Sequence, residues 1–258
     1  MISKYIFKYI TPIFFLIILF NSCKTAKDIL YIQDLNSTDI SKVYSSQNIL
    51  QENDILKIDV SSLEIKASVP YNKPLIGGVA GSNIDLIQLN GYLVSNNKTI
   101  NFPVLGEVSV ARLTVDDLEN YLRERLENEG HLIKPNVSIR LINSKFTVLG
   151  EVKLPGTYTF TEKNISFLQA IGLAGDLTID GNRKDIVLIR ESDGDRTTTK
   201  LDLTSASFLT SPYQNIHPND VIVVNPNSKK IKSAGLVGNI STVLSIASIL
   251  LSTIILIR

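Results

Sequence analysis

Alternating apolar and polar residues mark the strands of a first folded region. Residues 55–60 (ILKIDV) and residues 137–141 (VSIRL) alternate along their length, which predicts two half-buried β-strands. Between them, residues 91–94 and 99–102 flank the polar tetrapeptide SNNK, and this arrangement predicts a β-hairpin. The apolar pattern then continues as far as Val110, so a further strand is expected to follow the hairpin directly.

Apolar residues at helical spacing predict one long helix in this region. They are Val115, Leu118, Leu122 and Leu126. Thr114 and Asp117 have the spacing of a capping box at the helix start, and Gly130 supplies a left-handed terminator. Asp116 and Asp117 are adjacent carboxylates, but a solvated helix face explains them better than a catalytic acid–base pair. The first region is therefore predicted to be a small β–β–α–β unit of the α+β class.

A Pro–Gly turn opens a second folded region. An apolar run at 146–149 is followed by the turn KLPG at 153–156 and by the β-favouring residues TYTF at 157–160. Because proline presets φ and Gly156 accepts a positive φ, these residues predict a tight hairpin. Further strands are predicted at 186–189, 196–203 and 221–224, and a turn is predicted at 180–184.

A short helix is predicted between this hairpin and the later strands. Ser166 and Gln169 form a second capping box, and Gly175 ends the helix. Its predicted apolar face consists of Phe167, Leu168, Ile171 and Leu173. A hairpin, a helix and then several strands is the order expected for a β-grasp arrangement.

The pentapeptide VLGEV occurs in both regions, at 104–108 and at 148–152. The offset of 44 residues raises the question of a repeat array. However, a capped, charge-faced helix follows the first copy, whereas a Pro–Gly hairpin follows the second. We therefore interpret the two copies as matching strand–turn elements of two different domains.

The N-terminus has the pattern of a secretory signal. Lys4 and Lys8 precede an apolar run over residues 10–20, which is too short to span a bilayer as a stable helix. Cys23 follows a small residue, Ser22, and this sequence resembles a bacterial lipobox. The resemblance implies that residues 1–22 are removed and that Cys23 carries diacylglycerol and fatty acyl chains such as palmitate. The alternative is an ordinary free or buried cysteine behind an uncleaved anchor.

Residues 23–47 are polar with scattered apolar positions, which predicts an acylated tether that leads into the first region.

A second segment of membrane length lies at the C-terminus. Residues 235–257 carry no charge, and a helix of that length extends about 35 Å, enough to cross a hydrocarbon core of about 30 Å. Three lysines precede the segment and Arg258 follows it, positions that suit the membrane interface. We predict that residues 227–258 form a membrane-spanning helix.

Four serines at helical spacing form a stripe in this segment. They are Ser241, Ser245, Ser248 and Ser252. Three interpretations stay open. The stripe packs against neighbouring helices, as small-residue faces do. Alternatively, several copies turn their hydroxyl groups towards a water-filled pore. In the third, the helix is a lone anchor whose serines bond to their own backbone carbonyls.

Composition narrows the function classes. With 26 basic and 25 acidic residues, the chain lacks the excess of positive charge that nucleic-acid-binding proteins carry, so no nucleic-acid partner is expected. One cysteine excludes a disulfide framework and a zinc–cysteine cluster. The two histidines, His131 and His217, lie outside any ligand-spaced motif. We find no catalytic triad or phosphate-binding loop, and we predict neither a metal, a cofactor nor an enzymatic activity.

As a set, these motifs resemble the outer-membrane polysaccharide export lipoproteins of the Wza type. Residues 53–58 (NDILKI) and 102–108 (FPVLGEV) resemble the polysaccharide export domain. Residues 148–152, 155–158, 174–175, 180–184 and 220–224 resemble the soluble-ligand-binding β-grasp (SLBB) domain. Longer members of this family carry two β-grasp domains, whereas this chain has one.

The resemblance implies an α+β fold in three parts. A small export domain over 48–143 is followed by a single SLBB β-grasp domain over 144–226 and by the C-terminal transmembrane helix over 227–258. Within the second domain, Arg183 and Lys184 are candidates for contact with an anionic glycan, although a solvated turn explains them better.

The resemblance also implies a function without covalent chemistry. The chain is expected to be a subunit of a homo-oligomeric ring in the outer membrane that exports capsular or extracellular polysaccharide. Its main domains lie in the periplasm, its C-terminal helices form a barrel, and an inner-membrane polysaccharide co-polymerase docks beneath. The alternative is a membrane-anchored envelope lipoprotein that binds a soluble glycan through its β-grasp domain.

Overall fold

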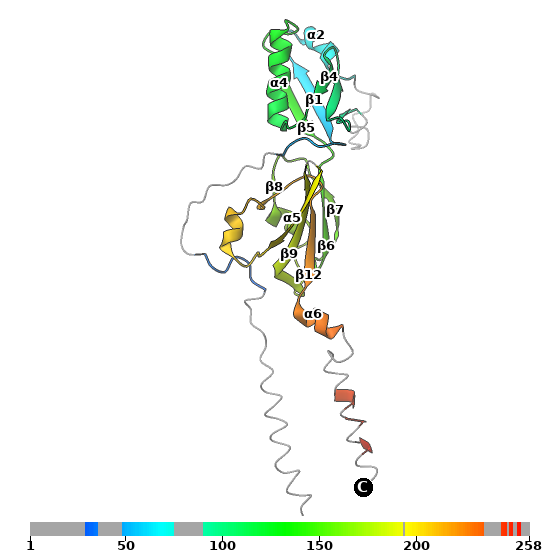
Figure 1. Ribbon diagram of the computed structural model, residues 1–258, viewed down its shortest axis with the longest axis vertical. Coiled ribbons are helices and arrows are strands. Elements are labelled where there is room, and N and C mark those ends of the chain that lie inside the picture. The colour runs from blue at the N-terminus through cyan, green and yellow to red at the C-terminus, as the bar shows by residue number, and fades with distance from the viewer. Residues whose placement is uncertain are drawn as a thin grey trace, which may run out of the picture.

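Two hydrophobic cores organise the chain in a computed structural model, one above the other along its long axis (Figure 1). The structure describes residues 29–35, 48–74, 90–192, 194–234 and, near the C-terminus, 244–246, 248–249 and 252–253. We call the part around the core from Leu50 to Ile139 the first unit, and the part around the core from Phe146 to Val224 the second unit.

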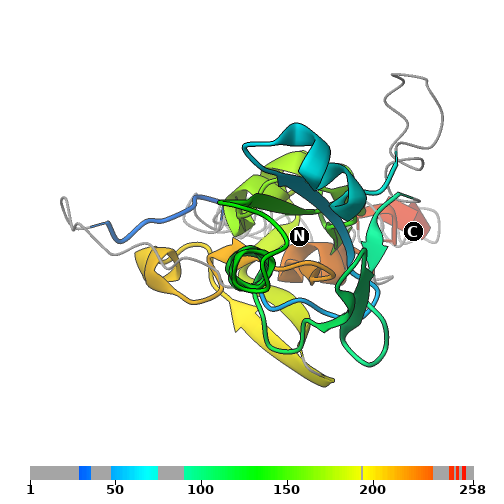
Figure 2. The same ribbon diagram turned by 90° about the horizontal axis from the view of Figure 1, so that it is seen from above.

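The first unit is a three-stranded antiparallel sheet covered by one helix. Its strands run in the order β2-β1-β5, and a separate hairpin, β3–β4, completes the core. The elements are β1 (Ile55–Ser61), α2 (Ile65–Ser68), η2 (Val69–Tyr71), β2 (Tyr92–Leu93), β3 (Thr99–Phe102), β4 (Gly106–Ser109), α4 (Val115–Asn128) and β5 (Asn136–Leu141). Helix α4 buries Leu118, Leu122 and Leu126, which confirms its predicted apolar face. Figure 2 views this helix nearly along its axis.

The predicted hairpin over 91–102 is wrong. Strand β2 pairs with β1, whereas β3 pairs with β4. The turn itself forms, because the N–H of Lys98 donates to the carbonyl of Ser95 at 2.9 Å. The partner changes because the backbone of Val94 is already engaged by the residues before β1: its N–H donates to Asp54 at 2.8 Å, and its carbonyl accepts from Asn53 at 3.0 Å.

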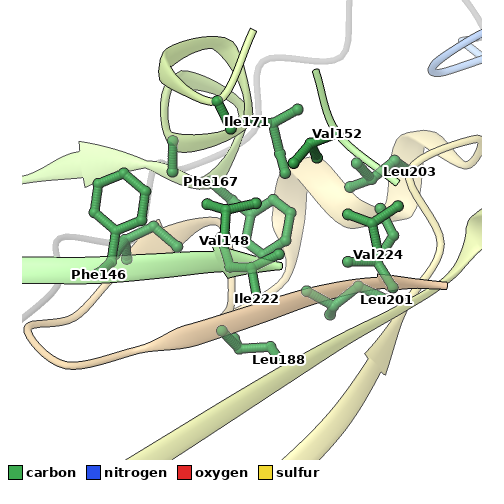
Figure 3. Close-up of a cluster of buried hydrophobic side chains, with 14 of the residues drawn as sticks. Phe146, Val148, Val152, Phe167, Ile171, Leu188, Leu201, Leu203, Ile222 and Val224 are labelled. Atoms are coloured by element: carbon green, nitrogen blue, oxygen red, sulfur yellow. The ribbon is translucent and has the colours of Figure 1, made fainter. Parts of the chain in front are cut away.

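The second unit is a five-stranded mixed sheet with a short helix on one face. The strand order is β10-β9-β12-β6-β7, with β12 parallel to β6 and the other neighbours antiparallel. The elements are β6 (Lys145–Gly150), β7 (Gly156–Thr159), β8 (Ile165–Ser166), α5 (Phe167–Leu173), β9 (Gly181–Ser192), β10 (Asp195–Leu201), η3 (Ala206–Thr210), β11 (Asn215–Ile216), β12 (Val221–Pro226) and α6 (Ser228–Ser233). Phe167 and Ile171 of α5 lie over strand residues such as Val148 and Ile222 (Figure 3).

Both predicted capping boxes are confirmed. Thr114 and Asp117 exchange hydrogen bonds at the start of α4, and Ser166 and Gln169 do so at the start of α5. The face of α5 differs in one position from the prediction, since Leu173 is 48% exposed. The small side chains of Ala170 and Ala174 are buried instead.

Strands β6 and β7 pair as a hairpin, but it is not the tight one predicted, because the pairing ends at Val148 and Gly156 with residues 149–155 between them. Its left-handed glycine is not the predicted one either. Gly150 has φ +89°, whereas Gly156 is absent from the described glycines with positive φ. The positive φ lies at Gly150 because the chain leaves β6 there beside β12, and the register pairs Gly150 with Val224.

The predicted turn at 180–184 is wrong beyond its first residue. Strand β9 begins at Gly181, which pairs with Pro226 beyond an irregularity in the β12–β9 ladder. The side chain of Arg183 consequently points into the unit, and only 4% of the residue is exposed. Arg183 is therefore a buried residue and not part of a solvated turn.

The linker between β5 and β6 is hydrogen-bonded to both units. The N–H of Ile142 donates to the carbonyl of Ile55 at 3.0 Å, and the side-chain oxygen of Asn143 accepts from the N–H of Ile55 at 2.9 Å. On the other side, the carbonyl of Ser144 accepts from the N–H of Phe160 at 3.0 Å. These bonds fix the direction in which the second unit leaves the first.

Several predictions fall on residues that the structure does not describe. The signal segment 1–22, Cys23, Ser241 and most of the predicted C-terminal span lie outside the described residues. Within the described ranges, no helix has both the length and the apolar character needed to cross a bilayer. Mixed helix and strand content agrees with the predicted α+β class.

Candidate functional site

Residues 31–34 form a strap across the second unit, where the sequence predicted only a tether. The N–H of Ile32 donates to the carbonyl of Leu203 at 3.0 Å, and the N–H of Gln33 donates to that of Thr204 at 2.8 Å. The carboxylate of Asp34 accepts from the Ser205 hydroxyl at 2.9 Å and also from the N–H of Ala206. The bond from Ala206, followed by that from Ser205, lowers the pKa of Asp34 below its ordinary value.

The strap covers a buried cation. The ring centre of Tyr31 lies 5.1 Å from the guanidinium carbon of Arg183, and the Tyr31 hydroxyl donates to Asp176 at 2.5 Å. Burial, reinforced by the bond to Asp176, raises the pKa of Tyr31 to about 12. Arg183 itself donates to the carbonyls of Gly181 and Thr178, at 3.2 and 3.4 Å. Its Nε atom has no partner among the described residues. Tyr31 thus places an aromatic face against a cation that water does not reach.

Replacing Tyr31 by alanine should release the strap. The change removes both the ring over Arg183 and the bond to Asp176, a combined loss of about 1–2 kcal/mol. We expect the amides of Ile32 and Gln33 to exchange hydrogen at least about tenfold faster, as measured by mass spectrometry. Tyr121→Ala, at an exposed position of α4, is the control and should leave this exchange unchanged. Unaltered exchange in Tyr31→Ala would contradict the role of Tyr31.

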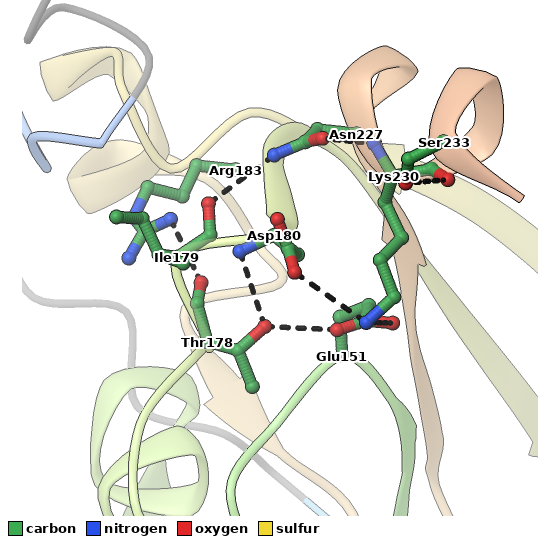
Figure 4. A network of polar contacts seen from close by, with 8 residues as sticks. All are labelled: Glu151, Thr178, Ile179, Asp180, Arg183, Asn227, Lys230 and Ser233. Carbon is green, nitrogen blue, oxygen red and sulfur yellow. Dashed lines mark hydrogen bonds and ion pairs between the residues drawn. The ribbon is translucent and has the colours of Figure 1, made fainter. Parts of the chain in front are cut away.

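A polar network fixes the start of α6 to the second unit (Figure 4). Asn227 caps α6 by accepting from the N–H of Lys230 at 3.0 Å, and its own N–H donates to the carbonyl of Asp180 at 2.7 Å. Lys230 reaches back to Asp180 at 3.4 Å and to Glu151 at 3.5 Å. The bond to Asp180, with the charge of Glu151, raises the pKa of Lys230. The ion pairs of Lys230 are partly exposed and therefore contribute little to stability. The backbone bond and the helix cap of Asn227 contribute more to fixing the position of α6.

The strap and α6 therefore both meet the second unit away from the first. In Figure 1 the strap (blue) crosses the lower half of the second unit, and α6 (orange) leaves from its lower end. Glu151, the acidic residue of the second VLGEV copy, links the hairpin loop to this end, since it accepts from the Thr178 hydroxyl at 2.9 Å. Apart from the apolar pair Tyr31–Ile32, no pattern along the chain indicated the strap.

Three of the four stripe serines lie in short helical stretches. Ser245, Ser248 and Ser252 are exposed. The Ser248 hydroxyl donates to the carbonyl of Ser245 at 2.9 Å, and the Ser252 hydroxyl donates to that of Ser248 at 2.8 Å. This geometry is the one expected for serines that bond to their own backbone. The role of the stripe in packing or in a pore stays a prediction.

The acidic and histidine residues weighed in the sequence have identifiable neighbours. Asp116 forms an ion pair with Lys163 at 2.5 Å, and Asp117 caps α4. Burial lowers the pKa of His217 to about 4, with a further contribution from the charge of Arg190, so this histidine is neutral at physiological pH. Within the part of the chain that the structure describes, no group of three or more potential metal ligands is assembled.

Comparison with known proteins gives two family matches in sequence order. Residues 43–142 match the model for the polysaccharide biosynthesis/export protein family, and residues 145–200 match the model for the SLBB domain. Together the two matches cover more than half of the chain.

One curated relative is the EPS I polysaccharide export outer membrane protein EpsA of Ralstonia nicotianae (strain ATCC BAA-1114 / GMI1000). It is 28% identical over 121 residues, which are 43% of this chain and 31% of the relative. The alignment thus spans about a third of the relative's length.

Proposed function

Since this chain belongs to the polysaccharide biosynthesis/export proteins and carries an SLBB domain, we propose that it is a subunit of a homo-oligomeric outer-membrane channel. The channel carries capsular or extracellular polysaccharide out of the periplasm without covalent chemistry on the protein. The observation that carries this proposal is the pair of family matches in consecutive order. The relative whose name places it in the outer membrane supports the location.

The positions of the strap and α6 support an orientation for this subunit. Acylated Cys23 anchors the chain at the periplasmic leaflet of the outer membrane. The eight residue-to-residue steps from Cys23 to Tyr31 span at most about 28 Å when the chain is fully extended. The second unit therefore lies next to the membrane, and the first unit points into the periplasm, where an inner-membrane co-polymerase docks. The segment after α6 enters the same membrane, with Ser241, Ser245, Ser248 and Ser252 at helix–helix contacts or facing the pore.

Deleting the gene should abolish export. We expect extracellular polysaccharide to fall at least about tenfold in the deletion strain. The full-length chain should restore it, whereas a chain truncated after Ala234 should not, because it lacks the proposed span. Undiminished export in the deletion strain would contradict the proposed function.

Assembly is tested on the full-length protein in detergent. Electron microscopy and native mass spectrometry should show closed rings of the chain, and the intact mass should include the acyl groups. A stable monomer would contradict the channel and would favour a membrane-anchored lipoprotein that binds a soluble glycan.

A further inference from the structure

A cleft of about 490 Å³ lies at the boundary between the two units. The first unit contributes the loop before β1, the first turn of α4 and part of β5, and the second unit contributes the β7–β8 loop and the end of β9. This volume falls within the range of about 300–1,000 Å³ that is typical of small-ligand sites. None of the residues discussed so far as anchor, strap or stripe lines it.

The walls of the cleft are held in place by bonds that cross the boundary. The linker between β5 and β6 is hydrogen-bonded to both units, as described above. On the opposite wall, Lys163 of the β7–β8 loop bonds to Asp116 of α4 at 2.5 Å. Because both of these side chains are more than 60% exposed, the linker bonds contribute more to the fixed geometry than this ion pair does.

Two buried polar groups face the cleft without a full set of partners. Asp54 is 5% exposed, and its carboxylate accepts a single hydrogen bond, from the N–H of Gln51 at 2.8 Å. Among the described residues, no lysine or arginine pairs with Asp54. Ser144 is also 5% exposed, and its hydroxyl has no hydrogen-bond partner within the described ranges. Both residues line the cleft.

Burial is the main cause that raises the pKa of Asp54, to about 6, so the carboxylate is largely ionised at neutral pH. A buried carboxylate is unfavourable unless hydrogen-bond donors surround it. The chain supplies one such donor. A molecule that brings further donors into the cleft therefore gains from meeting Asp54 there.

The charge of the walls restricts what that molecule is. Six carboxylates line the cleft, against two cationic side chains, Arg140 and Lys163. An anionic ligand such as a uronate or a phosphorylated sugar meets net repulsion there. Sugar hydroxyl groups, by contrast, are uncharged donors that suit carboxylate acceptors. Amide and hydroxyl side chains, including those of Asn164 and Thr161, complete a lining that suits a polyhydroxylated ligand.

We propose that this cleft is a glycan subsite, which binds one or two uncharged sugar residues between the two units. Asp54 accepts hydrogen bonds from sugar hydroxyls, and the Ser144 hydroxyl bonds to the same ring. The choice of a glycan rests on the proposed function in polysaccharide export. The restriction to uncharged sugars rests on the wall charges alone.

The test uses the full-length protein in detergent and fragments of the polysaccharide from the strain that encodes it. Partial acid hydrolysis releases oligosaccharides of four to eight residues, which anion exchange separates into an uncharged and an anionic fraction. Calorimetric titration should detect binding of the uncharged fraction, with affinity at least tenfold above that for the anionic fraction. Failure of the uncharged fraction to bind, or equal binding of both fractions, would overturn the proposal.

Two variants locate the binding. Asp54→Asn keeps an acceptor for the Gln51 N–H but removes the charge, and Ser144→Ala removes only the hydroxyl. We expect at least tenfold weaker binding for the first and at least threefold for the second. Asp59→Asn, the same substitution on the exposed face of β1, should bind within twofold of the unaltered chain. Unchanged affinity in both cleft variants would place the glycan elsewhere.

The outcome for the subsite is distinguishable from that for export. Loss of export on gene deletion without oligosaccharide binding would overturn the subsite and leave the channel proposal standing. Binding that depends on Asp54, together with normal export in the deletion strain, would overturn the channel proposal and leave the subsite standing. If Asp54→Asn fails to fold, as judged by circular dichroism, the Ser144→Ala titration decides.

Discussion

Replacing Gly150 by alanine should unfold the second unit at growth temperature. Gly150 ends β6 with φ +89°, and a Cβ atom there would lie 2.1 Å from the carbonyl oxygen of Val224 and 3.0 Å from its carbon. Those atoms belong to the backbone of β12, so they move only if the parallel β6–β12 ladder separates. The Glu151 N–H bond to the same Val224 carbonyl, at 3.0 Å, would be lost with it.

We expect Gly150→Ala to destabilise the second unit by about 4 kcal/mol or more, because backbone strain and the lost strand pairing add together. This corresponds to a fall in melting temperature of about 15 °C or more for a unit of this size. Thermal unfolding of the full-length protein, with hydrogen exchange in β6 and β12 as the local readout, measures it.

The first VLGEV copy supplies a matched control. Gly106 occupies the same place in that copy and also has a positive φ, +72°, but a Cβ atom there would meet nothing within 4 Å. Gly106→Ala should therefore cost only the backbone strain of a left-handed residue, about 1 kcal/mol. Equal losses in the two variants would show that the contact with Val224 is not the reason for glycine at position 150.

Replacing Arg190 by methionine should have a comparable effect. The guanidinium group of Arg190 in β9 donates two hydrogen bonds, of 2.9 and 2.8 Å, to the fully buried carboxylate of Asp220. It also donates to the carbonyl of Asn215 at 2.9 Å. Burial raises the pKa of Asp220 even though Arg190 acts in the opposite direction. Without Arg190 the carboxylate retains only the bond from the N–H of His217. We expect a loss of about 3–5 kcal/mol in a denaturant titration, as for other broken buried pairs.

Arg196→Met is the control for this prediction. Arg196 lies on the neighbouring strand β10 and pairs with Glu191, but the two side chains are 70% and 59% exposed. An exposed ion pair contributes about 0–1 kcal/mol, so this variant should remain close to the unaltered protein in stability. A loss as large as that of Arg190→Met would mean that burial does not decide the strength of the pair.

Local signals predicted α4 and α5 well, because the residues that start and end these helices lie within a few positions of one another. The capping boxes at Thr114 and Ser166 are satisfied by side chains three positions away, and the glycines at 130 and 175 adopt the left-handed conformation expected of terminators. The partner of β2 was not predictable in the same way. Residues 92–93 fit either a local hairpin or β1, and tertiary contacts of Val94 with Asn53 and Asp54 decide between them.

Long-range contacts also explain what was missed at the candidate site. The sequence DGNRK has the composition of a turn, yet its residues from Gly181 onwards belong to β9, because Gly181 pairs with Pro226 of β12. The strap then covers Arg183 through the ring of Tyr31. Tyr31 and Asp34 lie in a polar stretch without periodicity, so no pattern in the sequence distinguished them from a tether. The cleft beside Asp54 depends on how the two units meet, which neither unit's pattern contains.

In the proposed membrane arrangement, the strap also determines how mechanical load passes through the chain. For an anchor at Cys23 and a span after α6, tension between the two follows the strap into the second unit at Leu203 and Thr204 and leaves through Asn227. The first unit lies outside this load path, although it comes between the strap and the second unit in sequence. In the proposed arrangement, a partner that docks on the first unit therefore does not load the strap.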